Sequence, residues 1–186
     1  MTSEETAHKY DLGLDWSTGA PDPQVLSYRN RASIVVHTQE PTPDLTDPSL
    51  RILDADDEHA DLLGVIQLYG VHAIKIGGPN EEALRGHPLA DKGLTWMGNY
   101  RVLNSSWITE AEQINSVHSN HQPGWHDRLT HYVFAFHDET VECLVKAIRI
   151  ERYLGTPGAV LIDLIGRKKI WDEVEASVAG NPYDHP

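Results

Sequence analysis

The feature that most constrains the fold is a pair of alternating segments, HYVFAFHDETVECLV, at residues 131–145. Aromatic side chains occupy every second position of the first half, and Val141, Cys143 and Val145 do the same in the second half. Because successive side chains of a strand point to opposite faces, this pattern predicts a β-hairpin with one apolar face. A register shift of one residue would turn Glu142 into that face, so burial selects the pairing.

The apolar face of this hairpin is expected to belong to the core. With Asp138 and Glu139 as a two-residue tip, Phe134 lies opposite Cys143. We therefore expect Cys143 to be a small buried hydrophobic side chain and not a nucleophile.

The other face of the hairpin carries the groups that could perform chemistry. In the same register Glu142 faces Ala135 and lies diagonally from His137, within reach of long side chains. His131 would lie about 20 Å from His137 along the strand, at about 3.3 Å per residue. The two histidines could not then bind one metal ion, and His137 with Glu142 forms the candidate pair.

A third member is expected from the segment SSWITEAEQINSVHSNHQPG, which predicts a helix over about residues 106–121. Ser105 or Ser106 can cap its start, and a Pro-Gly pair ends it. His118 falls on the inward stripe of this helix, and His121 continues that stripe. We expect His118, and after it His121, to approach the hairpin.

This set supports three interpretations, which the sequence leaves open. His137, Glu142 and His118 could act as catalytic residues, with a histidine as general base and a carboxylate that orients it. His118, His121, His137 and Glu142 could instead hold a divalent metal, the one cofactor these residues suggest. The third interpretation is that these residues have no catalytic role.

Three further residues are candidates for binding a substrate. His87 lies in a loop after Gly86, Asn104 begins the run NSS, and Asp138 lies at the hairpin tip. No G-x-S-x-G elbow surrounds the serines, which disfavours a serine hydrolase. The glycines of KIGGPN have neither nucleotide-binding spacing.

The remaining patterns indicate an α+β fold. Strands are expected at residues 33–37, 64–76 with a bend at Gly70, and 95–103. Thr156-Pro157 starts an apolar run over 157–165 that favours a helix, with a buried strand as the alternative, and a second helix follows. We expect one antiparallel sheet of about five to six strands with helices packed on one face.

The length of 186 residues suits a single domain. We expect residues 26–180 to form it, residues 1–25 to be an arm that is disordered or laid on the surface, and residues 181–186 to be a loose tail.

Composition narrows the class of protein. One cysteine and the lack of a signal-peptide pattern favour a cytoplasmic location, and no apolar run is long enough for a membrane helix. The net charge of −13 disfavours nucleic-acid binding. Two functions remain. One is a small cytoplasmic enzyme that acts on a small polar molecule, and the other is an acidic, immunity-like accessory protein that masks a basic protein partner. A homodimer is left open.

Four short motifs occur in order along the chain: GHPL, NSSW, VHSNH and HYVFAFHDETVEC. Together they resemble a pattern in small uncharacterised bacterial proteins, over roughly residues 78–150. The resemblance implies that these segments form one unit, and no activity, cofactor or fold is attached to it.

Overall fold

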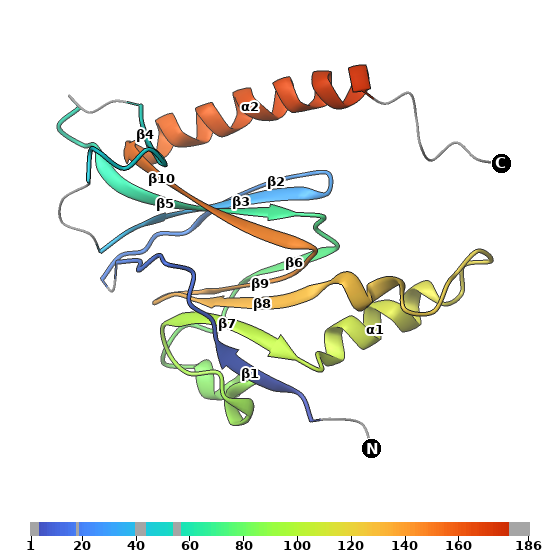
Figure 1. Ribbon diagram of the computed structural model, residues 1–186. Coiled ribbons are helices and arrows are strands. Elements are labelled where there is room, and N and C mark those ends of the chain that lie inside the picture. Colours follow the sequence, from blue (N-terminus) through green and yellow to red (C-terminus); the bar gives the residue numbers. More distant parts are fainter. Residues whose placement is uncertain (1–3, 18, 40–43, 54–56, 179–186) are drawn as a thin grey trace.

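Two five-stranded sheets pack face to face in the computed structural model (Figure 1). The structure describes residues 4–17, 19–39, 44–53 and 57–178. The expected mixture of antiparallel strands and helices is present, but the expectation of a single sheet is wrong. Each sheet buries its apolar inner face against the other sheet, so no helix is needed to cover these faces.

The first sheet is antiparallel throughout, and its strands are hydrogen-bonded in the order β1-β7-β8-β9-β6. Two of its strands form the hairpin predicted from the sequence. The bounds are β1 (Thr6–Lys9), β7 (Gly98–Leu103), β8 (Thr130–Ala135), β9 (Thr140–Val145) and β6 (Ala73–Gly77).

The second sheet has the order β2-β3-β5-β10-β4, and only the β10–β4 pair is parallel. Its outer face is covered by the C-terminal helix. The bounds are β2 (Gln24–Tyr28), β3 (Arg31–His37), β5 (Asp61–Tyr69), β10 (Ala147–Gly155) and β4 (Leu50–Ile52).

The two α-helices begin at the residues that the capping signals predict. In α1 (Ser106–Asn115) the Ser105 side chain accepts a hydrogen bond from the Ile108 amide, at 3.3 Å. The segment after Thr156 is a single helix, α2 (Pro157–Val178), so the strand alternative and the division into two helices are both wrong. The described residues also contain three short 3₁₀ turns: η1 (Leu84–Gly86), η2 (Ala90–Lys92) and η3 (Trp125–Arg128).

The main core lies between the sheets and contains the apolar face of the hairpin. Phe134, Phe136 and Cys143 are almost fully buried in it, as the alternation predicts. Burial raises the pKa of the Cys143 thiol to about 12, which keeps it protonated and unreactive at neutral pH.

The hairpin tip is wider than expected, and this moves the pairing by two residues. The Phe136 amide donates to the Glu139 carbonyl at 2.9 Å, and the ladder starts at Ala135 opposite Thr140. Phe134 therefore pairs with Val141 and not with Cys143. A shift of two residues leaves every side chain on its predicted face but changes which neighbours are diagonal.

The N-terminal segment is part of the fold, which corrects the expectation of an arm. Its strand β1 pairs with β7, and Leu14 and Trp16 enter the main core. The ring centroids of Trp16 and Phe136 are 4.7 Å apart. The apolar residues Leu12, Leu14 and Trp16 alternate, which is the signal that the acidic and glycine-rich composition masked. The predicted loose tail, residues 181–186, lies outside the described residues.

The chain passes between the sheets at two adjacent points. Residues 70–72, which begin with Gly70 at a φ of 60°, separate β5 in the second sheet from β6 in the first. Lys146 alone separates β9 from β10. A Cβ atom on Gly70 would lie 2.7 Å from the Lys146 side chain, so the two crossings touch. The bend predicted at Gly70 is confirmed, and the bent strand is in fact two strands of different sheets.

Candidate functional site

Glu142 is the centre of a buried polar network on the outer face of the first sheet. Its carboxylate lies 3.0 Å from Nε2 of His131 and 3.5 Å from Nε2 of His87. His131 reaches Glu142 because Glu142 pairs with Val133, which makes His131 its diagonal neighbour. His137 contacts Asp138 and Glu81 instead, so the expected His137–Glu142 pair is wrong and His131 takes the place of His137.

The other nitrogen of each ring also has a partner. Nδ1 of His87 accepts a hydrogen bond from the Leu89 amide at 3.1 Å. Nδ1 of His131 lies 2.9 Å from Oγ of Ser105, the residue that caps α1. Because the Ser105 oxygen accepts from the helix amide, its hydroxyl hydrogen is available to His131. Both rings then carry their proton on Nε2 and donate it toward Glu142.

A cation completes the network at its exposed side. Lys75 pairs with Glu142 across β6 and β9, with 4.0 Å between its nitrogen and the carboxylate. The same nitrogen lies 3.8 Å from the centre of the Trp107 ring. Burial alone would raise the pKa of the Glu142 carboxyl, but contacts from His131 and His87 and the charge of Lys75 outweigh it and hold that pKa well below its ordinary value.

This network is better suited to holding separate parts of the chain together than to binding a substrate. The side chains of Glu142 and His131 are 11% and 3% exposed, and both ring nitrogens of His131 are engaged. The members of the network, Glu142 included, come from the loop at His87, from the start of α1 and from three strands of the first sheet. The geometry favours a stabilising role for Glu142.

His137 belongs to a different, half-exposed group at the hairpin tip. Its Nδ1 lies 2.8 Å from the Asp138 carboxylate, and its Nε2 lies 3.4 Å from Glu81. The hydrogen bond to Asp138, followed by the charges of Glu81 and Glu82, raises the pKa of the His137 ring above its ordinary value despite an opposing effect of burial.

This arrangement gives a testable pH behaviour. We expect the ring resonances of His137 to titrate with a midpoint above the ordinary pKa of histidine, because a raised pKa keeps the ring charged to higher pH. NMR titration of the wild type and of Asp138→Asn would measure it. The substitution should lower the midpoint, and an unchanged midpoint would show that Asp138 is not the cause.

The two helix histidines do not approach Glu142. His118 and His121 both follow the end of α1 at Asn115, which is six residues earlier than expected. His118 is exposed, and His121 lies 3.0 Å from Glu112. The chain folds back after α1, and the backbone amides of Gly124 and His126 donate hydrogen bonds to the Glu112 carboxylate, which favours the early end of the helix.

Glu112 thus gathers a second histidine group that the sequence did not reveal. It contacts His121 and Nδ1 of His126, and these bonds, chiefly the one from His126, lower the pKa of the Glu112 carboxyl. The ring of His72 meets that of His126 edge to face, with 4.7 Å between centroids. Within the described part of the chain, no group of three or more acidic, histidine or cysteine side chains is arranged to hold a metal ion. The predicted metal ligands are therefore not brought together.

The three predicted substrate-binding residues lie in three different places. His87 is buried beside Glu142, as described above. Asn104 adopts a φ of 53°, and its side chain donates to the Glu4 carbonyl. Asn104 also lines a cavity of about 550 Å³, and Asp138 lines a cavity rich in polar groups.

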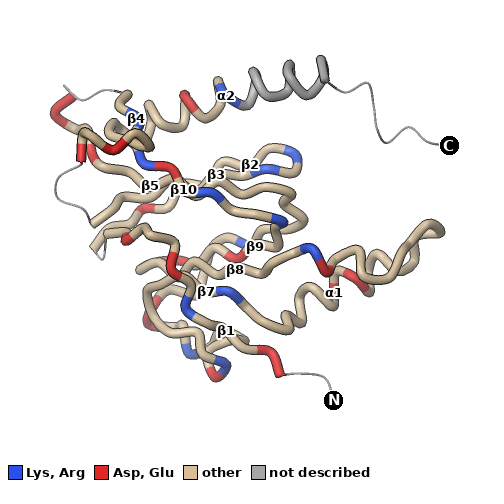
Figure 2. Tube along the Cα trace, in the orientation of Figure 1, with Lys and Arg blue, Asp and Glu red and all other residues tan. Residues whose placement is uncertain are grey.

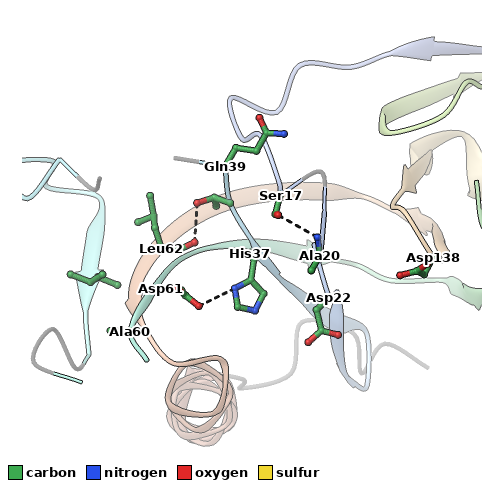
Figure 3. A pocket seen from close by; sticks show the side chains of 11 residues that line it. Ser17, Ala20, Asp22, His37, Gln39, Ala60, Asp61, Leu62 and Asp138 are labelled. Carbon is green, nitrogen blue, oxygen red and sulfur yellow. Dashed lines mark hydrogen bonds and ion pairs between the residues drawn. The ribbon is translucent and has the colours of Figure 1, made fainter. Parts of the chain in front are cut away.

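This cavity, which we call the end pocket, lies where the ends of β3, β5 and β10 meet the β8–β9 turn (Figure 3). Its volume is about 730 Å³. The polar side chains that line it are Ser17, Asp22, His37, Thr38, Gln39, Asp61 and Asp138.

His37 is the best-positioned titratable group of the end pocket. Its Nδ1 lies 3.3 Å from the Asp61 carboxylate, and Figure 3 shows its ring between Asp61 and Asp22. The backbone of His37 is held on both sides, because its amide donates to Pro21 and its carbonyl accepts from Ser17. The N-terminal segment therefore holds the backbone that carries this side chain.

Negative charge gathers at the end pocket. Asp22, Asp61 and Asp138 line it, and acidic residues mark the corresponding strand ends in Figure 2. The neighbouring Glu139 responds to this charge, since burial and then the charges of Asp22 and Asp138 raise the pKa of its carboxyl. Such a pocket favours a ligand that carries positive charge.

The sequence offered one weak signal for the end pocket. His37 and Asp61 are polar residues at the end of one apolar strand and the start of another. They meet only because β3 and β5 are antiparallel neighbours, with His37 opposite Leu63.

Comparison of the chain with protein-family models, with curated proteins and with solved structures finds no match. Among the described residues, no helix is both long enough and apolar enough to cross a membrane.

Proposed function

We propose that the protein binds a small, positively charged polar molecule in the end pocket. The observation that supports this is a cavity of about 730 Å³ lined by the His37–Asp61 pair and by the carboxylates of Asp22 and Asp138. Pockets for small molecules commonly measure about 300–1,000 Å³. A basic side chain of a protein partner would meet the same carboxylates, but the pocket is larger than one side chain requires.

The pocket offers groups for orientation as well as charge. The Thr38 hydroxyl donates to the Leu62 carbonyl at 2.8 Å, which leaves its oxygen able to accept from a ligand. Ser17 and Gln39 add a hydroxyl and an amide. Ammonium or guanidinium groups donate several hydrogen bonds and accept none, so they match a lining of acceptors.

The His37–Asp61 pair favours a second function at the same place, general acid–base catalysis on the bound molecule. A carboxylate at Nδ1 orients the ring and favours a proton transfer through Nε2. The His37 side chain is 26% exposed, which leaves it accessible from the pocket. The proposed enzyme would then use His37 and Asp61 in the end pocket, and not the residues of the hairpin.

Binding is tested by calorimetry with three cations, arginine, spermidine and choline, and with citrulline as the uncharged analogue of arginine. We expect at least one cation to bind and Asp22→Asn or Asp138→Asn to weaken it about tenfold each, since each removes one charge from the lining. Asparagine keeps the shape of aspartate and tolerates the positive φ of 39° at Asp22.

Asp91→Asn is the matched control, because Asp91 is exposed in η2, outside the pocket lining. Absence of saturable binding by all three cations, or equal binding of arginine and citrulline, would overturn the proposal. For catalysis, wild type and His37→Gln are compared for depletion of the bound cation by mass spectrometry. Depletion by both proteins would exclude His37 as the acid–base group.

A further inference from the structure

Four arginines line one small cavity on the outer face of the second sheet, beside α2. The chain has 28 acidic and 15 basic residues, so this concentration of positive charge opposes the overall balance. The cavity measures about 140 Å³. Its charged side chains are Arg31, Arg51, Arg149, Arg167 and Glu151.

The strand register explains why these residues meet. Ser33, Gln67 and Arg149 are direct partners across β3, β5 and β10, and therefore point to the same face. Arg31 lies two residues from Ser33 on that face. Arg51, on β4, pairs with Tyr153 of β10. One turn after Leu164, α2 adds Arg167. Four separate elements thus direct guanidinium groups to one place.

The two carboxylates of this region, Glu151 and Asp163, are bound by arginines of the same cavity. Glu151 accepts a hydrogen bond from Arg167 at 3.0 Å and one from the Tyr153 hydroxyl at 3.0 Å. Asp163 accepts from Nε of Arg167 at 2.6 Å. Arg149 lies 3.8 Å from Glu151, and its side chain is 69% exposed. Among the described side chains and leaving Arg31 aside, three arginines (Arg51, Arg149 and Arg167) meet these two carboxylates, so positive charge exceeds negative charge.

Uncharged donors add to the cavity. The Ser33 hydroxyl donates to the Gln67 carbonyl oxygen at 2.8 Å, which leaves the Gln67 amide nitrogen as a donor. Arg31 lies over the ring of Tyr69, at 5.5 Å from its centre, so the aromatic side chain supports the guanidinium. Guanidinium and amide groups in this number suit a ligand with several anionic oxygens.

We propose that this cavity, the arginine pocket, binds a phosphate group. Its volume of about 140 Å³ is below the about 300–1,000 Å³ usual for a whole small molecule, so it would take one anionic head group. Guanidinium groups that approach from β3, β4, β10 and α2 match the tetrahedral oxygens of phosphate better than the planar pair of a carboxylate.

The arginine pocket is independent of the end pocket and goes beyond the proposed function. Both use β3 and β5, but at opposite ends: Arg31 and His37 are about 20 Å apart along β3, at about 3.3 Å per residue. One face of the second sheet would thus bind an anion far from the cation-binding pocket.

The test is calorimetric titration with inorganic phosphate and, separately, with succinate, at constant ionic strength. We expect saturable phosphate binding that is tighter than succinate binding. Arg149→Gln and Arg51→Gln should each weaken it about tenfold, since each removes one charge-assisted contact. Both side chains are exposed at the rim of the fold, so circular dichroism should show an unchanged fold.

Arg85→Gln is the matched control, because it removes the same charge from an exposed turn, η1, that packs with the first sheet. It should leave the phosphate affinity unchanged. Three results would overturn the proposal: no saturable phosphate binding, equal weakening by Arg85→Gln, or tighter binding of succinate. Asp22→Asn should not affect phosphate binding, which separates this test from that of the end pocket.

Discussion

Replacing Trp16 with alanine should lower the free energy of unfolding by about 3–5 kcal/mol, the cost typical of a large aromatic removed from a core. Trp16 is 5% exposed and packs on Phe136 between the two sheets. Alanine would leave a cavity there, and it would weaken the hold of the N-terminal segment on β3. Ligand binding in the end pocket should weaken as well, because the amide of the next residue, Ser17, donates to the His37 carbonyl.

Urea denaturation followed by circular dichroism measures this effect. Trp96→Ala is the matched control, since Trp96 is 49% exposed and its removal should cost less than about 1 kcal/mol. If the two variants lost equal stability, Trp16 would not be a core residue and the N-terminal segment would be the arm that its composition suggests.

The second large effect concerns Glu142. We expect Glu142→Gln to cost about 2–3 kcal/mol at neutral pH, because hydrogen bonds to a buried charge are worth more than neutral ones. Glutamine keeps the size of the side chain but removes the charge that His131, His87 and Lys75 approach. Its amide nitrogen, itself a donor, would also face one of the two N–H donors, His131 or His87.

The cost should depend on pH in a defined direction. The pKa of the Glu142 carboxyl lies below its ordinary value of 4.5 in the folded protein. The stabilisation is therefore complete above about pH 4.5 and is lost as the pH falls through the lower, folded pKa. The difference between wild type and Glu142→Gln should be constant near neutral pH and should shrink in acid.

Chemical denaturation at a series of pH values measures this difference, with Glu110→Gln on the exposed side of α1 as control. The control should remain within about 0.5 kcal/mol of wild type, as is usual for surface substitutions. A Glu142→Gln variant with wild-type stability at neutral pH would contradict the stabilising role and reopen the question of a catalytic one.

The hairpin shows what could be predicted from the sequence and what could not. Alternation assigns Phe134 and Cys143 to the core and Glu142 to the opposite face, and both assignments are confirmed. Alternation has a period of two, so it cannot distinguish registers that differ by two residues. That ambiguity decides which histidine meets Glu142, because the narrower turn makes His137 its diagonal neighbour and the observed turn makes His131 that neighbour.

The other differences arise from contacts between distant segments. Nothing local in the chain pairs His37 with Asp61, since this requires knowing that β3 lies beside β5. The early end of α1 has the same origin, because it depends on backbone amides 12 and 14 residues after Glu112. Capping at Ser105 and at Thr156, in contrast, involves only neighbouring residues and was predictable.

The paired crossings at Gly70 and Lys146 bear on how the molecule comes apart. Two polypeptide segments run from one sheet into the other at the same corner, and backbone hydrogen bonds join them there, from the Lys146 amide to Tyr69 and from the His72 amide to Leu144. Neither sheet can melt while the other keeps its strands at this corner, so the two layers form one cooperative unit. The end pocket lies at the far ends of β5, β9 and β10, away from this seam. The two sheets are thus joined covalently at one corner, and the end pocket lies at the opposite one.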